Sequence, residues 1–81
     1  MDELEVFVTV VEAQGFSAAA KRLDSTPAAV SRRIKALEQR LGVRLLQRTT
    51  RTLKLTEAGE LYFREVSRLL GDLRAVEEQL D

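Results

Sequence analysis

The sequence contains no cysteine, no histidine and no tryptophan among its 81 residues. Without cysteine, the chain has no disulfide bond, no thiolate nucleophile and no zinc site of the usual Cys/His type. Without histidine, it lacks the side chain that most often serves as a general base near neutral pH. The longest apolar runs are only a few residues, and the acidic start MDELE lacks the features of a secretory signal. We therefore expect a soluble cytoplasmic domain that does not span a membrane.

The net charge is also zero, because 13 acidic side chains balance 13 basic ones, but the charges are unevenly distributed. Residues 1–20 carry four acids and no base, a net charge of −4. Residues 21–54, which we call the basic block, carry ten bases and two acids, a net charge of +8. Residues 55–81 carry seven acids and three bases, again −4. Such a block is typical of a polyanion-binding surface; the alternative is a solvated surface whose bases pair with neighbouring acids.

Two helices are predicted near the N-terminus. The first is predicted between Asp2, a favourable N-cap, and Gly15, a typical stop signal. Ser17 is predicted to cap a second helix that runs to Leu23, in which three consecutive alanines permit another helix to approach closely. The apolar side chains of the first helix recur at helical spacing: Leu4, Phe7, Val8 and Val11.

A turn at Asp24 and Ser25 leads into a third predicted helix, which ends near Gly42. Thr26 followed by Pro27 is typical of an N-cap and a first helical position. The buried stripe of this helix is predicted to be Val30, Ile34, Leu37 and Leu41. Small, polar and basic residues share the opposite face: Ala28, Ser31, Arg32, Lys35 and Gln39. A tight turn before a helix of this kind predicts a helix-turn-helix that fits the major groove of DNA, the alternative being a surface helix whose charges only solubilise the domain.

The hydrophobic period changes between residues 43 and 56. Residues 52–55 alternate polar and apolar, which predicts a strand that pairs with residues 46–48 in a hairpin, or wing. Arg51, near the tip of this hairpin, is the right kind of side chain for a minor groove, where the negative potential attracts guanidinium groups. Alternatively, it is an exposed loop charge.

A last helix is predicted from Thr56, its N-cap, to the end of the chain. Its apolar side chains are spaced four and three apart, as in a heptad seam: Tyr62, Val66, Leu69, Leu73, Val76 and Leu80. A second apolar line, consisting of Phe63, Val66 and Leu70, can face the core of the domain. The seam predicts homodimerisation, the alternative being packing against the same small domain. The expected fold is mainly α: a winged helix-turn-helix over residues 1–56, with a three-helix core and a β-hairpin, and a linker and dimerisation helix over residues 57–81.

Three linked segments resemble the N-terminal DNA-binding domain of LysR-type transcriptional regulators. They are LEVFVTVVEAQGFSAAAKRL (4–23), TPAAVSRRIKALEQRLGVRLLQR (26–48) and T-x-R-x-x-x-LTEAG, which spans Thr49, Arg51 and 55–59. The resemblance covers essentially the whole chain. It implies a winged helix-turn-helix, a dimerising linker helix and binding to an interrupted inverted repeat in double-stranded promoter DNA. It also implies a larger domain that binds a small effector; because this chain lacks that domain, we expect the sequence to be a DNA-binding fragment.

The resemblance also implies roles for individual residues at matching positions. The residues expected to read bases from the third helix are Thr26, Pro27, Ala28, Ser31, Arg32 and Lys35. The residues expected to contact the DNA backbone, or to lie in the wing, are Ser17, Ala18, Arg48, Thr49, Thr50 and Arg51. Many members have Ser-Gln-Pro where this chain has Thr26-Pro27-Ala28, so the usual Gln is absent. At that place we expect only apolar contact from Ala28, for example to a thymine methyl group.

Sequence-specific binding of duplex DNA by a dimeric bacterial transcription regulator is the leading hypothesis. A protein–protein interaction module with the same winged-helix fold is the alternative, but it gives no reason for ten bases in 34 residues. An enzyme is not expected, because the sequence has no Gly-rich phosphate loop, no nucleophile–base pair and no metal-ligand cluster. For the same reasons we expect no cofactor and no metal.

Overall fold

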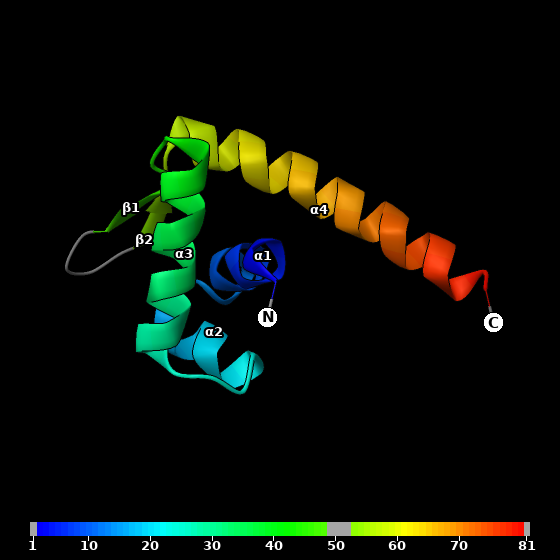
Figure 1. The fold of residues 1–81 in the computed structure, drawn as a ribbon, viewed down its shortest axis with the longest axis horizontal. Helices are drawn as coiled ribbons and strands as arrows, with labels where there is room; N and C mark the ends of the chain where they lie inside the picture. Colours follow the sequence, from blue (N-terminus) through cyan, green and yellow to red (C-terminus); the bar gives the residue numbers. More distant parts are fainter. Residues whose placement is uncertain (1, 49–52, 81) are drawn as a thin grey trace.

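The computed structural model describes residues 2–48 and 53–80, which form four helices and a two-stranded hairpin. The elements are α1 (Glu3–Ala13), α2 (Phe16–Arg22), α3 (Pro27–Leu41), β1 (Leu46–Arg48), β2 (Leu53–Leu55) and α4 (Glu57–Glu78). Figure 1 shows α1 at the centre of the molecule, the hairpin beside α3, and the second half of α4 extending away from the other elements. The predicted mainly helical, winged helix-turn-helix fold is confirmed. No helix in these two ranges has both the length and the apolarity of a membrane span.

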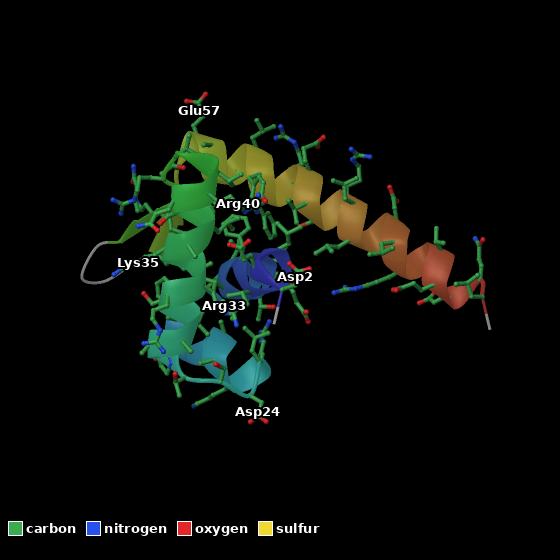
Figure 2. The ribbon with its side chains drawn as sticks, in the orientation of Figure 1. Asp2, Asp24, Arg33, Lys35, Arg40 and Glu57 are labelled. Atoms are coloured by element: carbon green, nitrogen blue, oxygen red, sulfur yellow. The ribbon has the colours of Figure 1, made fainter. Side chains whose placement is uncertain are left out.

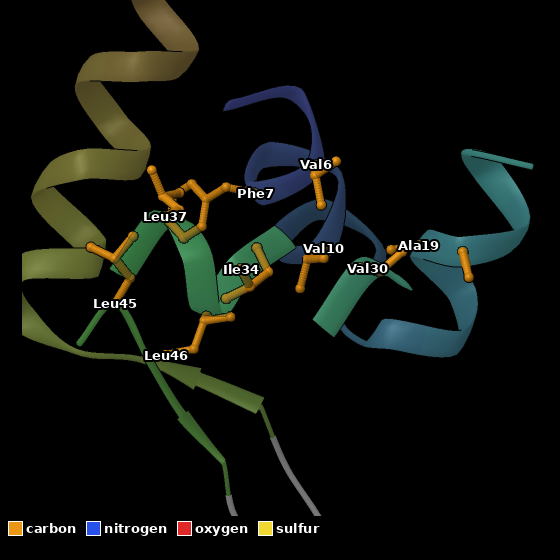
Figure 3. Close-up of a cluster of buried hydrophobic side chains, with 10 residues drawn as sticks. Val6, Phe7, Val10, Ala19, Val30, Ile34, Leu37, Leu45 and Leu46 are labelled. Atoms are coloured by element: carbon orange, nitrogen blue, oxygen red, sulfur yellow. The ribbon is translucent and has the colours of Figure 1, made fainter. Parts of the chain in front are cut away.

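The core lies where α1, α2, α3 and the start of the hairpin meet (Figure 3). Its fully or almost fully buried side chains are Val6, Phe7, Val10, Ala19, Ala20, Val30, Ile34, Leu37, Leu45 and Leu46. The predicted stripe of α3 is therefore confirmed, with Leu41 half-buried at its end. On α1 the buried face is centred on Phe7, whereas Leu4, Val8 and Val11 pack at its edges.

The junction between α1 and α2 differs from the prediction in two ways. Gln14, not Gly15, ends α1 in the left-handed conformation, with φ 62°, and the Gly15 amide donates to the Val10 carbonyl at 3.3 Å. Gly15 is instead the N-cap of α2, which begins at Phe16 and has no side-chain cap, so the predicted Ser17 cap is wrong. The physical reason is apolar burial, because this earlier start packs Phe16 against the core.

Local signals do fix the turn between α2 and α3. Asp24 adopts a left-handed conformation, with φ 53°, and the Ser25 amide donates to the Ala20 carbonyl at 2.8 Å. The Thr26 hydroxyl then accepts a hydrogen bond from the Ala29 amide at 3.1 Å, which caps α3 as predicted. At the other end of α3, Gly42 is left-handed, with φ 75°. The predicted bounds of α3 are confirmed.

The hairpin pairs as predicted, and its second strand leads directly into α4. Leu46 lies opposite Leu55 and Arg48 opposite Leu53 in an antiparallel ladder, while Thr52 is outside the described residues. Thr56 is the predicted cap of α4: its hydroxyl accepts from the Gly59 amide at 2.9 Å and donates to the Arg44 carbonyl at 2.6 Å.

The first turn of α4 is pressed against the segment that links α3 to β1. The Thr56 amide donates to the Leu45 carbonyl at 3.0 Å. A Cβ atom at Gly59 would overlap the same carbonyl oxygen, so only glycine fits at this position without movement of the backbone. The linking segment therefore sets where α4 begins.

Candidate nucleic-acid interface

The outer side of α3 and its cap presents the six residues that sequence reasoning assigned to base recognition. Thr26, Pro27, Ala28, Arg32 and Lys35 are exposed, and Ser31 is half-buried. They lie together because burial of the apolar stripe turns the opposite side of α3 outward. Figure 2 shows Lys35 on the hairpin side of α3 and Arg40 on the side of α1. The side chains on this accessible face are small near the N-terminal end of α3 and cationic beyond it.

The start of α2 contributes a second part of this surface. Ser17 and Ala18 are exposed in its first turn. The amide groups of a first turn have no partners within their own helix, so they suit an anionic oxygen such as that of a phosphate. Lys21 and Arg22 follow at the end of the same helix and are also exposed.

The hairpin residues assigned to DNA contact fall mostly outside the described part of the chain. Thr49, Thr50 and Arg51 lie outside it altogether, and of Arg48 only the backbone position in β1 is described. In the described part of the hairpin, Lys54 is exposed on β2.

Ion pairing within the basic block decides between the two interpretations of its charge. Arg40 lies 3.2 Å from Glu3 of α1, and Arg44 lies 3.7 Å from Glu38. No other ion pair within the described ranges involves a base of the block. The bases left without one are Lys21, Arg22, Arg32, Arg33, Lys35 and Lys54. Most described bases of the block are therefore not neutralised by neighbouring acids, which favours the interpretation as a polyanion-binding surface.

Glu38 is a site that sequence reasoning missed, because the charge count treated it as one more surface acid. Its side chain is only 10% exposed, and one carboxylate oxygen accepts hydrogen bonds from the amides of Leu45 and Leu46, at 2.8 and 3.2 Å. A sequence signal was present: Glu38 lies four residues after Ile34 and directly after Leu37, at the edge of the apolar stripe. An acid at that position needs a buried hydrogen-bond donor.

The structure divides the predicted seam of α4 into two parts. Val66 is buried in its own domain, and Tyr62 packs on the core with its ring centroid 5.5 Å from that of Phe7. In the second apolar line, Phe63 packs on the core and Val66 is buried, while Leu70 is half-buried and is not part of that cluster. The four remaining seam residues, Leu69, Leu73, Val76 and Leu80, are between 53% and 81% exposed. Val66 is thus occupied within its own domain, and these four form the part of the seam that is open to a partner.

These features define a class of protein, namely a winged helix-turn-helix with an exposed basic face on α3. The chain belongs to the bacterial regulatory helix-turn-helix protein, lysR family, whose family model matches residues 1–60.

Individual relatives agree with this assignment. The chain is 52% identical over 79 residues to the HTH-type transcriptional regulator CrgA of Neisseria meningitidis serogroup C (strain 8013), an alignment that covers 98% of this chain and 26% of that protein. It superposes on the BenM DNA-binding domain, solved in complex with catB site 1 DNA, with a TM-score of 0.92 and 34% identity, covering 99% of this chain and 92% of that one.

A second solved structure is that of full-length AphB, the Vibrio cholerae virulence activator. The TM-score is 0.88 and the identity 40%, over 98% of this chain and 27% of that one. The chain therefore spans only 26% of the length of CrgA and 27% of the AphB chain.

Proposed function

We propose that this chain is the DNA-binding domain of a bacterial transcription regulator that reads duplex DNA as a homodimer. The observation that carries the proposal is a set of exposed bases on α2 and α3 that have no ion pair with another described residue: Lys21, Arg22, Arg32 and Lys35. Phosphate groups of a duplex supply the missing counter-charges. The BenM domain, solved with DNA, supports this use of the fold. The domain acts in the cytoplasm, by binding rather than by catalysis.

In the proposed complex, α3 enters the major groove with its N-terminal half. Arg32 and Lys35 are long enough to reach base edges or phosphates, and Ser31 can donate or accept a hydrogen bond. Ala28 offers a methyl group to a thymine methyl, and Thr26 and Pro27 bring the backbone close to the bases. The exposed start of α2, with Ser17 and Ala18, contacts phosphate oxygens. The hairpin, with Arg48, Thr49, Thr50 and Arg51, lies along the adjacent backbone and minor groove.

The exposed seam of α4 is the proposed dimer contact. Leu69, Leu73, Val76 and Leu80 continue the spacing of Tyr62 and Val66 beyond the end of the core. A second copy of α4 covers these side chains, and the resulting two-fold axis presents two copies of α3 to an interrupted inverted repeat. The effector-binding domain of the whole protein lies outside this chain.

Binding to a duplex at several salt concentrations tests the proposal. The probe is a duplex that the wild-type domain selects from a random-sequence pool, and fluorescence anisotropy gives the dissociation constant. The logarithm of the affinity is expected to fall linearly with the logarithm of the salt concentration, because phosphate neutralisation releases counterions.

Matched variants show where the charge acts. Lys35→Ala is expected to weaken binding and to reduce the salt slope by about 1. Arg74→Ala removes one base from the extended half of α4, outside the basic block, and is expected to leave both values unchanged. Absence of binding by the wild-type domain at low salt contradicts the proposal and favours a protein–protein interaction module.

A further inference from the structure

Glu38 is a charged side chain in a place where a small domain usually buries apolar groups. It is 9% exposed as a residue and borders Leu37, which is fully buried. A buried carboxylate costs free energy unless hydrogen bonds compensate, and an apolar side chain of similar size often stabilises a fold at least as well. Its presence therefore calls for a role other than packing.

The hydrogen bonds of Glu38 connect the proposed recognition helix to the first strand of the hairpin. Oε2 of Glu38 accepts from the amide of Leu45, which precedes β1, and from the amide of Leu46, which begins it. The same oxygen lies 3.7 Å from Nε of Arg44. A single carboxylate oxygen thus holds three consecutive residues against α3. Because β1 pairs with β2 along its whole length, both strands follow this attachment.

We propose that Glu38 is a positioning residue that sets the orientation of the hairpin relative to α3, so that both elements reach DNA together. This inference rests on the proposed function. Without the carboxylate, α3 keeps its buried stripe and still fits the major groove, but the hairpin is no longer held at one angle. The complex then forms through α3 without the contacts of the hairpin, and the affinity falls by the contribution of those contacts.

Two substitutions at this position separate the hydrogen bonds from the charge. Glu38→Leu has a similar size but no acceptor, so the amides of Leu45 and Leu46 lose their partner. Glu38→Gln retains one oxygen that can accept from both amides, and it loses only the charge near Arg44. We expect about a tenfold weaker affinity for the Leu variant, corresponding to loss of the hairpin's contacts from the complex. The Gln variant is expected to bind like the wild type.

Dimethyl sulfate footprinting on the duplex selected by the wild-type domain gives the decisive readout. This reagent methylates guanine N7 in the major groove and adenine N3 in the minor groove, so one reaction reports on both. At saturating protein, Glu38→Leu is expected to keep the major-groove protection and to lose the minor-groove protection. Val6→Ala, which removes core packing at the start of α1, away from the end of that helix that borders the hairpin, is the matched destabilised control and is expected to keep both.

Two other footprints overturn the proposal. Equal loss of both protections in Glu38→Leu, or loss of neither, means that Glu38 does not act through the hairpin. If Glu38→Leu does not fold, Glu38→Asp replaces it, because its shorter side chain withdraws the oxygen from both amides. If Glu38→Asp does not fold either, the hydrogen bonds of Glu38 to the two amides are required for the fold itself and the positioning role is refuted. Failure of the wild-type domain to bind any duplex refutes the proposed function instead.

Discussion

The two glycines of α4 provide a test of the packing at the start of that helix. Gly59 is buried, and a Cβ atom there would overlap the Leu45 carbonyl oxygen. Gly71 is exposed twelve residues later, and a Cβ atom there would meet nothing within 4 Å. The same substitution, to alanine, is therefore expected to have opposite effects on stability at the two positions.

The magnitude follows from three contributions. Alanine is better than glycine inside a helix by about 1 kcal/mol, a gain that applies at both positions. At Gly59 the overlap with Leu45 requires a backbone shift, for which overpacking costs about 1–3 kcal/mol. The same shift weakens the hydrogen bond from the Thr56 amide to the Leu45 carbonyl, worth about 1 kcal/mol net. We therefore expect Gly59→Ala to lower the free energy of unfolding by about 2 kcal/mol and Gly71→Ala to raise it by about 1 kcal/mol.

Thermal unfolding followed by circular dichroism at 222 nm, at one protein concentration, measures the difference. A change of 1 kcal/mol shifts the midpoint of a domain of this size by about 4–8 °C, so the two variants are expected to differ by roughly 12–24 °C. A Gly59→Ala variant as stable as the wild type would refute the close packing of α4 on Leu45. A Gly71→Ala variant that is destabilised would show that this glycine makes a contact absent from the isolated chain.

Three further outcomes are expected. Gln14→Gly relieves a left-handed residue at the end of α1 and should raise the free energy of unfolding by about 0.5–1 kcal/mol in urea titrations; no gain would mean that the Gln14 side chain compensates for its backbone conformation. Leu73→Glu places a charge on the exposed seam and should produce monomers in sedimentation experiments, whereas a persistent dimer would place the interface elsewhere. Arg32→Ala should change base preference by about 1–3 kcal/mol at one position in selection experiments, while Lys21→Ala should weaken all duplexes alike; the reverse pattern would exchange their roles.

Sequence reasoning succeeded where local signals decide the structure. The bounds of α3 follow from a capping threonine, a proline at the first helical position and a left-handed Gly42, each of which acts over three or four residues. The antiparallel pairing of residues 46–48 with residues 53–55 also followed from the change of period.

Prediction failed where tertiary packing outweighs local preference. Capping propensity favoured Ser17, but burial of Phe16 starts α2 earlier, and Gln14 accepts the conformation expected of glycine. The heptad spacing of α4 is real, but spacing alone does not say where a helix leaves its own core, and Tyr62, expected only in the seam, packs on the core. The role of Glu38 depends on residues seven and eight positions further on, which no helical pattern reports.

The backbone of Leu45 links α3 to α4, and this link has a mechanical consequence. Its amide donates a hydrogen bond to Glu38 of α3, and its carbonyl oxygen accepts one from the amide of Thr56, the residue before α4. The recognition helix, the hairpin and the root of α4 therefore move as one body in each copy of the proposed dimer. A change in the angle between the two α4 helices then alters the separation of the two recognition helices without altering either one.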